Sequence, residues 1–421
     1  MTRLVVWCDT DRVGVLDTTT TNELRFTYDA EVATTARLEH AVGVRCPVRA
    51  RPYVGRDAEC VFENLLPEGA LRDTLAQSTK HDVSDTLGLL GAVGSECAGA
   101  LQLWPEGMER PRTPEYEPLS ADAMRSAFAG AESQVRAVSG RASLSGAQAK
   151  LALWRMPQTG GAAARYMFPR NGAPTTVVVK RQNAQFPGLL EAELVGMRLM
   201  RAAGVPTASS ERCAADQSAH ESARFDRVVR ADGSVGRLHA EDGCQLTGRL
   251  SRNKYANHGA PTFQELVAVL DRWSVAPLDD RESLFRWAVA NAAVGNYDAH
   301  AKNVSVMYEV PERLRLAPAY DVVVTTVFAS LDRTFSLSFG GTTHPQALTP
   351  ASVRVAAREF RLPERRVREL AAVVVHAVRA ALPGVLHEVA AMHGDASMLE
   401  ALDRAVRETS QALANRLGVG G

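Results

Sequence analysis

Strand-like hydrophobic runs open the chain and predict a β-rich module. The runs are rich in β-branched and aromatic residues and are separated by polar turns, as expected for short strands. They cover Arg3–Trp7, Arg12–Leu16 and Glu23–Tyr28. Helix-like stretches follow around the turn that begins at Asn64. We therefore expect residues 1–105 to form an N-terminal subdomain.

The hydrophobic spacing changes after this subdomain. Residues 106–119 are rich in Pro and Glu and predict a linker. Further on, Thr175–Val179 predicts a buried strand that ends at Lys180, because β-branched residues favour strands. Apolar residues at helical spacing follow in Gly188–Met200. These elements indicate a nucleotide-binding lobe over residues 120–225.

Helical patterns dominate the rest of the chain. Thr262 begins a capping box with Glu265 ahead of an apolar run, which marks a helix start. The last 70 residues repeat Ala, Val, Leu and Arg at helical spacing and predict a helical scaffold. We assign residues 226–421 to a catalytic and helical C-terminal lobe, and the whole chain to the α+β class.

Composition narrows the choice of partners and compartment. The chain has 421 residues, 46% of them hydrophobic, and equal numbers of basic and acidic side chains, 48 of each. Zero formal charge argues against strong nucleic-acid binding by the chain as a whole. Six cysteines without C-x-x-C spacing read as reduced thiols of a cytosolic protein. We expect no targeting or membrane segment, because polar residues and Pro383 interrupt the apolar stretch Ala371–Leu386.

One arginine-rich segment has two interpretations. Glutamates interleave with the arginines, which favours a solvated helix face over a contact with DNA or a partner. The arginines are Arg354, Arg358, Arg361, Arg365, Arg366 and Arg368.

Candidate chemistry begins with an Asp and an Asn five positions apart. Asp298 and Asn303 follow an apolar, helix-like run. Phosphoryl transfer needs a carboxylate that orients and deprotonates the attacking hydroxyl, and a side-chain oxygen that holds Mg²⁺. The spacing alone is weak, because a chain of this length carries it by chance about once. Two predicted strands then lead to Asp321, a second acid in the place where protein kinases keep their main metal-binding Asp.

Residues earlier in the chain supply a cation and a loop that could bind nucleotide phosphates. An ammonium group at Lys180 could neutralise nucleotide phosphates, with Glu193 or Glu191 as its ion-pair partner. The segment Ser143–Lys150 precedes this lysine at about the distance of a phosphate-covering loop. It has one glycine, so it is neither a kinase Gly-rich loop nor a Walker A sequence.

Five motifs together resemble the HipA family of serine/threonine kinases, the toxins of bacterial toxin–antitoxin pairs. The resemblance extends to the front of the chain, at Phe62–Gly69 and Gly94–Gln102. It therefore covers nearly the whole chain, and it implies a protein-kinase-like fold of two lobes. The five motifs are Ser143–Leu153, Arg224–Arg227, Leu238–Gln245, Gly295–Asn303 and Leu316–Val322.

The resemblance implies ATP and Mg²⁺ as cofactors and a role for each matching residue. Asp298 matches the catalytic Asp, Asn303 and Asp321 match the Mg²⁺ ligands, and Lys180 matches the strand lysine that contacts the nucleotide and assists catalysis. The phosphate-covering loop corresponds to Ser145, Gly146, Ala147, Gln148, Ala149 and Lys150. Further matches line the ATP site at His300, Lys302, Tyr320, Ala223, Arg224, Phe225 and Asp226, the last at the ribose.

Two of these assignments have open alternatives. Ala223 stands where family members often have an acidic or polar residue, so adenine would be held by backbone groups at Ala223 and Phe225. His300 has about even odds of orienting the backbone or contacting a phosphate.

Regulation and partners are also implied by the resemblance. Ser143 matches the serine that family members autophosphorylate, with Ser145 as the alternative, and a phosphate there would repel ATP phosphates and switch the kinase off. The partner would be a small DNA-binding antitoxin like HipB, through which alone the chain would reach DNA, and the acceptor an aminoacyl-tRNA synthetase. A small-molecule kinase of the same fold and a non-catalytic module that binds nucleotide and antitoxin are the alternatives.

Overall fold

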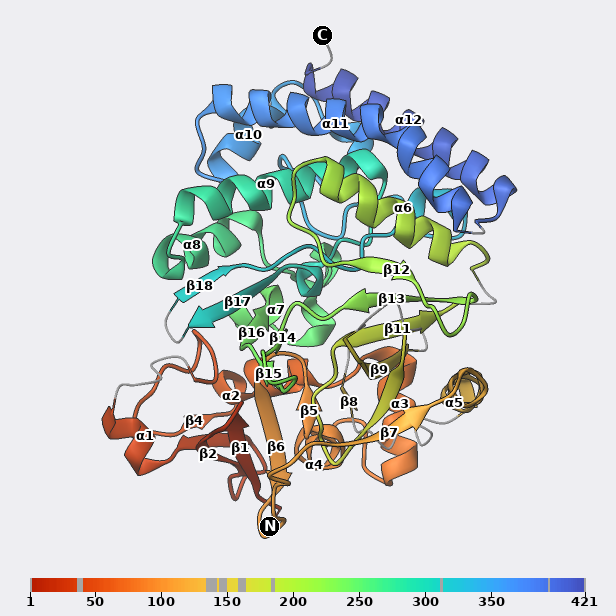
Figure 1. Ribbon diagram of the computed structural model, residues 1–421. Coiled ribbons are helices and arrows are strands. Elements are labelled where there is room, and N and C mark those ends of the chain that lie inside the picture. Colours follow the sequence, from red (N-terminus) through yellow and green to blue (C-terminus); the bar gives the residue numbers. More distant parts are fainter. Residues whose placement is uncertain are drawn as a thin grey trace. The chain divides into compact units, whose positions relative to one another are not determined.

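The computed structural model divides into two compact units, each assembled from three separate segments of chain (Figure 1). The first unit comprises Met1–Arg181, Glu211–Glu241 and Met307–Arg313, and the second comprises Gln182–Ser210, Asp242–Val306 and Leu314–Gly421. The structure describes residues 2–35, 41–133, 142–143, 150–157, 164–182, 186–310, 313–392 and 394–419.

A five-stranded sheet with strand order β4-β3-β2-β1-β6 opens the first unit. Its strands confirm the three predicted N-terminal runs, because alternate residues such as Leu4, Val6 and Phe26 turn inward and are fully buried. Helices α1 to α4 follow this sheet in the sequence. The bounds are β1 Leu4–Cys8, β2 Asp11–Thr18, β3 Leu24–Tyr28, β4 Tyr53–Val54, β6 Leu101–Pro105, α1 Ala30–Thr35, α2 Arg56–Phe62, α3 Gly69–Thr79 and α4 Thr86–Val93.

A six-stranded sheet with order β12-β13-β11-β9-β10-β7 provides the second layer of strands. One face of it packs on α5 (Ala121–Ser133) through Met124 and Phe128, which are fully buried with Val179 and Leu151. The strand bounds are β7 Glu115–Leu119, β9 Lys150–Arg155, β10 Tyr166–Arg170, β11 Val177–Arg181, β12 Ser210–Arg212 and β13 Ala219–Ala223.

The end of the predicted linker over residues 106–119 is a strand. Pro and Glu suggested a linker, but β7 pairs with β10 in antiparallel register, with Pro118 opposite Met167. Because β7 is the edge of the sheet, Pro118 can lack an amide hydrogen without breaking an interior ladder. The prediction was therefore wrong for Glu115–Leu119.

Short strands complete the β-structure. β5 (Glu96–Cys97) runs parallel to β8 (Ala142–Ser143), and β14 (Arg227–Val229) pairs with β15 (Val235–Arg237). A three-stranded sheet has the order β16-β17-β18, with bounds Ala240–Asp242, Ser305–Val310 and Arg313–Leu316. The last two strands confirm the predicted hairpin, whose turn residues lie outside the described part of the chain.

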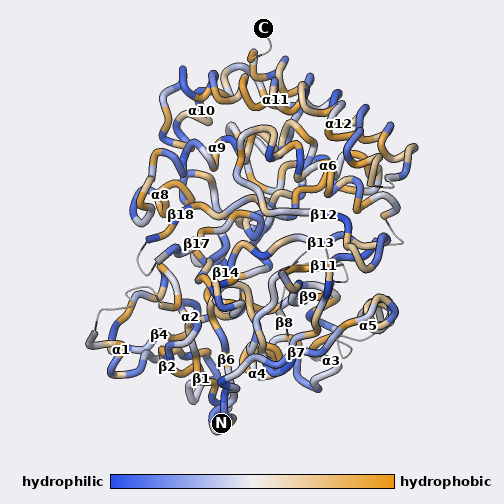
Figure 2. Tube along the Cα trace, viewed as in Figure 1, coloured by the Kyte–Doolittle hydropathy of each residue, from blue (hydrophilic) through white to orange (hydrophobic). Residues whose placement is uncertain are grey.

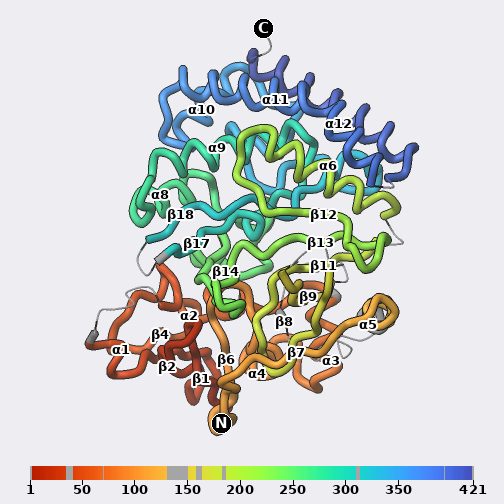
Figure 3. Tube along the Cα trace, in the orientation of Figure 1, coloured from red at the N-terminus to blue at the C-terminus, as the bar shows by residue number. Residues whose placement is uncertain are grey.

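Helices form most of the second unit. α11 packs against α6, α9 and α12, and Figure 3 shows these helices side by side although α6 is far away in the sequence. Thr262 and Glu265 form the predicted capping box at the start of α8. The bounds are α6 Leu189–Ala202, α7 Gly243–Thr247, α8 Phe263–Trp273, α9 Pro277–Val294, α10 Ser352–Glu359, α11 Glu364–Ala391 and α12 Ala396–Leu417.

The long helix α11 has the length and apolar composition of a membrane span, although 39% of its most apolar window is buried inside the protein. It carries hydrophobic and hydrophilic residues along its length (Figure 2), and its buried side packs on neighbouring helices. One such helix is weak evidence, because core helices pass the same test.

The arginine-rich segment forms ion pairs within the second unit. Arg366 pairs with Glu282 at 2.6 Å, Arg361 with Asp271 at 2.6 Å and Arg368 with Glu364 at 2.8 Å. These pairs favour the interpretation as a solvated helix face. The β-rich N-terminal part and the largely helical C-terminal part confirm the predicted α+β class, and all six cysteines are free thiols.

Candidate active site

The loop that carries Asp298 is fixed at both ends within the second unit. Helix α9 ends at Gly295, whose φ of 79° belongs to the left-handed region, and a Cβ there would lie 2.3 Å from Thr326 Oγ1. Glycine therefore meets both demands of the turn. The Thr325 hydroxyl accepts from Tyr297 N at 2.9 Å and donates to the Gly295 carbonyl at 3.0 Å. These bonds hold the start of the loop without using its acidic side chain.

Asp298 projects from this loop as an exposed carboxylate. Tyr255, which precedes a short 3-10 turn (Ala256–His258), donates its hydroxyl to Asp298 Oδ1 at 3.1 Å. The backbone N–H of His300 donates to the Asp298 carbonyl at 2.8 Å. The carboxylate is thus oriented by a phenol that lies 43 positions earlier in the chain.

Asn303 and Asp321 meet on the other side of the loop. The Asn303 side chain accepts from His300 N at 3.1 Å, and its amide nitrogen lies 3.4 Å from Asp321 Oδ2. Asp321 has φ of 58°, a left-handed backbone that costs a non-glycine residue energy and often marks a functional site. The exposed Asp321 carboxylate supplies oxygen ligands of the kind that Mg²⁺ prefers. The Asn303 oxygen accepts from His300 N and its nitrogen faces Asp321, so its role as a second ligand stays a prediction.

Lys302 and Tyr320 stabilise the loop that carries Asp298 and Asn303 through an ion pair and a hydrogen bond. The Lys302 ammonium lies 2.5 Å from Asp242 Oδ2, and the Tyr320 hydroxyl donates to the Lys302 carbonyl at 2.6 Å. Asp242 also caps α7 by accepting from Gln245 N at 2.9 Å. Burial, with the Asp242 charge and despite a hydrogen bond to Ser305, raises the pKa of Tyr320, so its phenol stays protonated. Both predicted ATP-site side chains therefore have a structural role, and their contact with a nucleotide stays a prediction.

His300 is a buried neutral imidazole. Burial lowers its pKa well below the usual 6.5, helped by the nearby Lys254 charge and opposed by Asp321. Its ring lies edge-on to Tyr255, with centroids 5.3 Å apart, and its side chain caps the turn Ala301–Asn303 by accepting from the backbone N–H of Asn303. The cap is a structural role for His300, and its contact with a phosphate stays a prediction.

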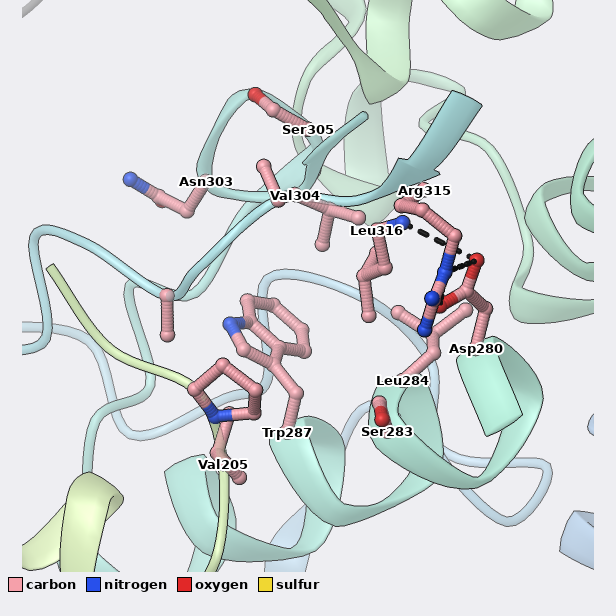
Figure 4. A pocket seen from close by; sticks show the side chains of 13 residues that line it. Val205, Asp280, Ser283, Leu284, Trp287, Asn303, Val304, Ser305, Arg315 and Leu316 are labelled. Atoms are coloured by element: carbon pink, nitrogen blue, oxygen red, sulfur yellow. Dashed lines mark hydrogen bonds and ion pairs between the residues drawn. The ribbon is translucent and has the colours of Figure 1, made fainter. Parts of the chain in front are cut away.

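A small cavity lies behind Asn303, between the loop and helix α9 (Figure 4). Asp280, almost fully buried at the start of α9, accepts from Arg315 Nε at 3.0 Å and from Leu316 N at 3.2 Å. The Asn303 amide points away from this ion pair (Figure 4). The hairpin that follows the loop is thereby anchored to the helix that precedes it.

The first unit holds the candidate phosphate-binding cations. Lys180 is the penultimate residue of β11, because the strand runs one residue further than predicted, to Arg181. It is directly opposite Lys150 on β9 and His220 on β13. Paired residues on neighbouring strands project from the same face, so two lysines and a histidine form a row on one side of the sheet. Glu191 and Glu193, its two candidate ion-pair partners, are both buried on α6, so burial does not choose between them.

Arg224 and Asp226 occupy a buried ion cluster within the first unit. Arg224 Nη2 lies 2.7 Å from Asp226 Oδ2, which also accepts from Gly99 N at 2.7 Å. Glu96 lies at the centre, fully buried, and pairs with Arg224 at 3.0 Å, Arg227 at 2.9 Å and Arg237 at 2.7 Å. With these partners the Asp226 carboxylate is committed to the fold, which argues against the predicted ribose contact. Ala223 is exposed and Phe225 half-buried, and their backbone contact with adenine stays a prediction.

Part of the predicted phosphate-covering loop lies outside the described residues, namely Ser145, Gly146, Ala147, Gln148 and Ala149. The backbone of Ser143 belongs to β8 and pairs with Cys97. Tyr255, Asp242 and Glu96 were missed by sequence reasoning. The partners of Tyr255 and Glu96 are far away in the chain, and no local spacing marks these two residues. Asp242 has a local capping box with Gln245, but its ion pair with Lys302 spans 60 positions.

Comparisons with known proteins bear on the family and the fold of the chain. The profile of the HipA-like C-terminal domain matches residues 142–382, and that of the HipA N-terminal domain matches residues 4–104. The Sinorhizobium fredii protein named "Putative kinase Y4mE" is 33% identical over 80% of each chain. The Shewanella oneidensis "Serine/threonine-protein kinase toxin HipA" is 25% identical over 68% of this chain and 67% of its own length.

A solved structure supports the fold. HipA of Shewanella oneidensis, in its complex with HipB and operator DNA, superposes with a TM-score of 0.82 over 99% of this chain and 97% of that chain, at 20% identity. The C-terminal profile spans more than half of the sequence, and the N-terminal profile covers most of the rest. The chain therefore belongs to the HipA family of kinases.

Proposed function

We propose that the protein is an ATP- and Mg²⁺-dependent serine/threonine protein kinase. The observation that carries the proposal is the contact between Asn303 and Asp321, 3.4 Å apart, on the loop system that also exposes Asp298. Asp298 would orient the acceptor hydroxyl and take its proton, while Asn303 and Asp321 would hold Mg²⁺. A bound Mg²⁺ supplies charge that stabilises the transferring phosphoryl group.

Cations in the first unit suit the ATP phosphates. Lys150 and Lys180 are cross-strand partners, so their ammonium groups belong to the same face of the sheet. Two cationic side chains on one face suit the negative charge of phosphate oxygens, which supports a role for both lysines there. The neutral His300 could donate or accept a hydrogen bond at the phosphates without adding charge.

Tyr255→Phe is expected to lower kcat about five-fold and to leave the KM for ATP unchanged. The change removes only the hydroxyl that bonds Asp298 Oδ1 at 3.1 Å, and such a bond on an exposed site is worth about 1 kcal/mol. A fall in ATP affinity with an unchanged kcat would contradict this positioning role.

The proposal extends to toxin activity and to the partner that controls it. We infer that the partner is a small DNA-binding antitoxin, because the Shewanella oneidensis HipA is found in a complex with HipB and operator DNA. DNA would be reached only through this antitoxin, as a neutral chain suggests. The acceptor class would be an aminoacyl-tRNA synthetase, whose phosphorylation would stall translation. These statements rest on the family and not on a described contact.

Autophosphorylation at Ser143 is the expected self-inactivating event. A phosphate there adds up to about two negative charges to the loop that should receive ATP phosphates, so repulsion would displace nucleotide. After phosphatase treatment, incubation with ATP and Mg²⁺ should add one phosphate to the wild type and to Ser145→Ala, but none to Ser143→Ala. Intact-mass analysis with fragmentation of the peptide locates the modification.

Other outcomes of this experiment have definite meanings. Phosphate on Ser145 alone would transfer the regulatory role to that residue. Binding of ATP without any transfer, to itself or to protein acceptors, would favour the non-catalytic module. Transfer only to small hydroxyl compounds would favour a small-molecule kinase of the same fold.

A further inference from the structure

A cavity of about 880 Å³ lies beside Asp298 within the second unit. Its wall is formed by the turn after Tyr255, by the loop around Asp298, and by a segment near residues 331–344. The lining residues are Tyr255, Ala256, Asn257, His258, Tyr297, Asp298, Thr325, Leu331, Asp332, Thr334, Phe335, Ser336, Thr343 and His344. The catalytic carboxylate of the proposed kinase is thus part of the cavity wall.

Hydrogen bonds tie the three walls together. Ala256 N donates to the Ser336 carbonyl at 2.8 Å, and Ser336 N donates to the Tyr297 carbonyl at 3.1 Å. Phe335 N also donates to the Thr343 carbonyl at 2.7 Å, which closes the third segment on itself. Half-buried Glu359 accepts from the backbone N–H groups of Gly340 and Gly341, at 3.0 and 3.1 Å. These hydrogen bonds fix the wall segments of the cavity relative to one another.

The charge of the wall is distinctive. Among the lining residues there are two carboxylates, Asp298 and Asp332, and neither Lys nor Arg. Asp332 is exposed and accepts from Thr334 N at 3.0 Å, so a turn fixes its carboxylate in place. Cations lie close to the wall without lining it: the Arg333 guanidinium donates to the Thr326 carbonyl at 2.6 Å, and the Lys254 ammonium lies over the Tyr255 ring at 5.1 Å. A wall of this charge repels phosphate-bearing acceptors and attracts cationic ones.

We propose that this cavity is the acceptor site and that Asp332 selects polypeptide segments with Lys or Arg close to the reacting Ser or Thr. The inference rests on the proposed kinase function. In the reaction the acceptor oxygen bonds to the γ-phosphorus of ATP, and the bond from that phosphorus to the β,γ-bridging oxygen breaks. The hydroxyl proton passes to Asp298, and ADP leaves. The aromatic rings of Tyr297 and Phe335, edge-on with centroids 5.3 Å apart, offer apolar surface for the rest of the segment.

Two synthetic serine peptides that differ only in flanking Arg or flanking Asp test the proposal. At saturating ATP and Mg²⁺, the wild type should phosphorylate the Arg peptide with a kcat/KM roughly five-fold above that of the Asp peptide, the effect of one exposed charge pair. Asp332→Lys should invert this preference, a change of roughly twenty-five-fold in the ratio. Asp332→Asn, which keeps an acceptor for Thr334 N, should reduce the preference, because the Asp298 carboxylate remains in the wall.

Glu400→Lys is the matched control, because Glu400 is an exposed acid on α12 outside the cavity lining. It changes net charge by the same amount and should keep the wild-type preference. A wild type that autophosphorylates but treats both peptides equally, or modifies neither, would overturn the acceptor proposal alone. So would a preference that survives Asp332→Lys, or an equal loss in Glu400→Lys. A wild type that binds ATP but transfers phosphate neither to itself nor to peptides contradicts the proposed function itself.

Discussion

Asp298→Asn is expected to lower the rate of phosphate transfer roughly a thousand-fold while ATP affinity changes little. The asparagine is isosteric and can still accept the Tyr255 hydroxyl, so the loop should keep its shape. It cannot take the proton of the acceptor hydroxyl, and general base catalysis is typically worth about 10² to 10⁴ in rate. Single-turnover transfer from labelled ATP, with separate titration of nucleotide binding, measures both quantities.

Two further variants sharpen this result. Asp279→Asn replaces an exposed Asp at the start of α9 and should retain wild-type activity. Asp321→Asn removes the proposed metal carboxylate, so it should raise the Mg²⁺ concentration needed for half-maximal rate, whereas Asp298→Asn should not. If Asp298→Asn keeps more than a tenth of the wild-type rate, another residue serves as the base.

Glu96→Gln is expected to destabilise the first unit by about 3 to 5 kcal/mol, the range found when one partner of a buried ion pair is removed. The change leaves Arg224, Arg227 and Arg237 buried without the carboxylate that they share. Hydrogen exchange should accelerate in the peptides that contain β5 and β13, and should stay unchanged in α11. Glu117→Gln, which breaks an exposed pair with Arg170, should have a much smaller effect.

Lowering the pH should also destabilise the first unit through the Glu96 carboxylate. Burial alone would raise the pKa of Glu96, but the charges of Arg227, Arg237 and Arg224 outweigh it and lower the pKa to about 2, from an ordinary value of 4.5. A carboxyl group with a lowered pKa in the folded state stabilises the fold above its ordinary pKa. That contribution is lost as pH falls from about 4.5 towards 2. The slope of unfolding free energy against pH should therefore be shallower in Glu96→Gln over this window; an unchanged slope would show that Glu96 is not the group that titrates.

The parts of the fold that sequence predicted well are those that local spacing determines. The N-terminal strands and the capped start at Thr262 depend on residues within one element. Sequence reasoning could identify Asp298 and Asn303 for the same reason, because both lie in one short loop. β7 was missed because a Pro near the end of an acidic strand looks like a linker, and only the edge position in the sheet makes it acceptable.

The rest of the site depends on pairing across long stretches of chain. Glu96 and Arg224 are 128 positions apart, so no local sequence pattern predicts their ion pair. The same is true of Tyr255, which meets Asp298 only after the intervening helices have packed. Asp226 looked like a ribose ligand by its motif position, and its burial with two arginines could not be anticipated without the fold.

The interleaved division of the chain has a consequence for its synthesis. Each unit needs segments that are separated in sequence, and Met307–Arg313 is the last piece of the first unit to leave the ribosome. In many proteins an N-terminal unit folds before the next unit is translated. The first unit of this protein cannot do so, because parts of the second unit are translated before its last segment. Asp298 emerges before the first unit can be completed and before Asp321, α11 and α12 exist. Nascent chains should therefore be inactive until α12 has been translated, and a product arrested before that point would carry the catalytic loop without its activity.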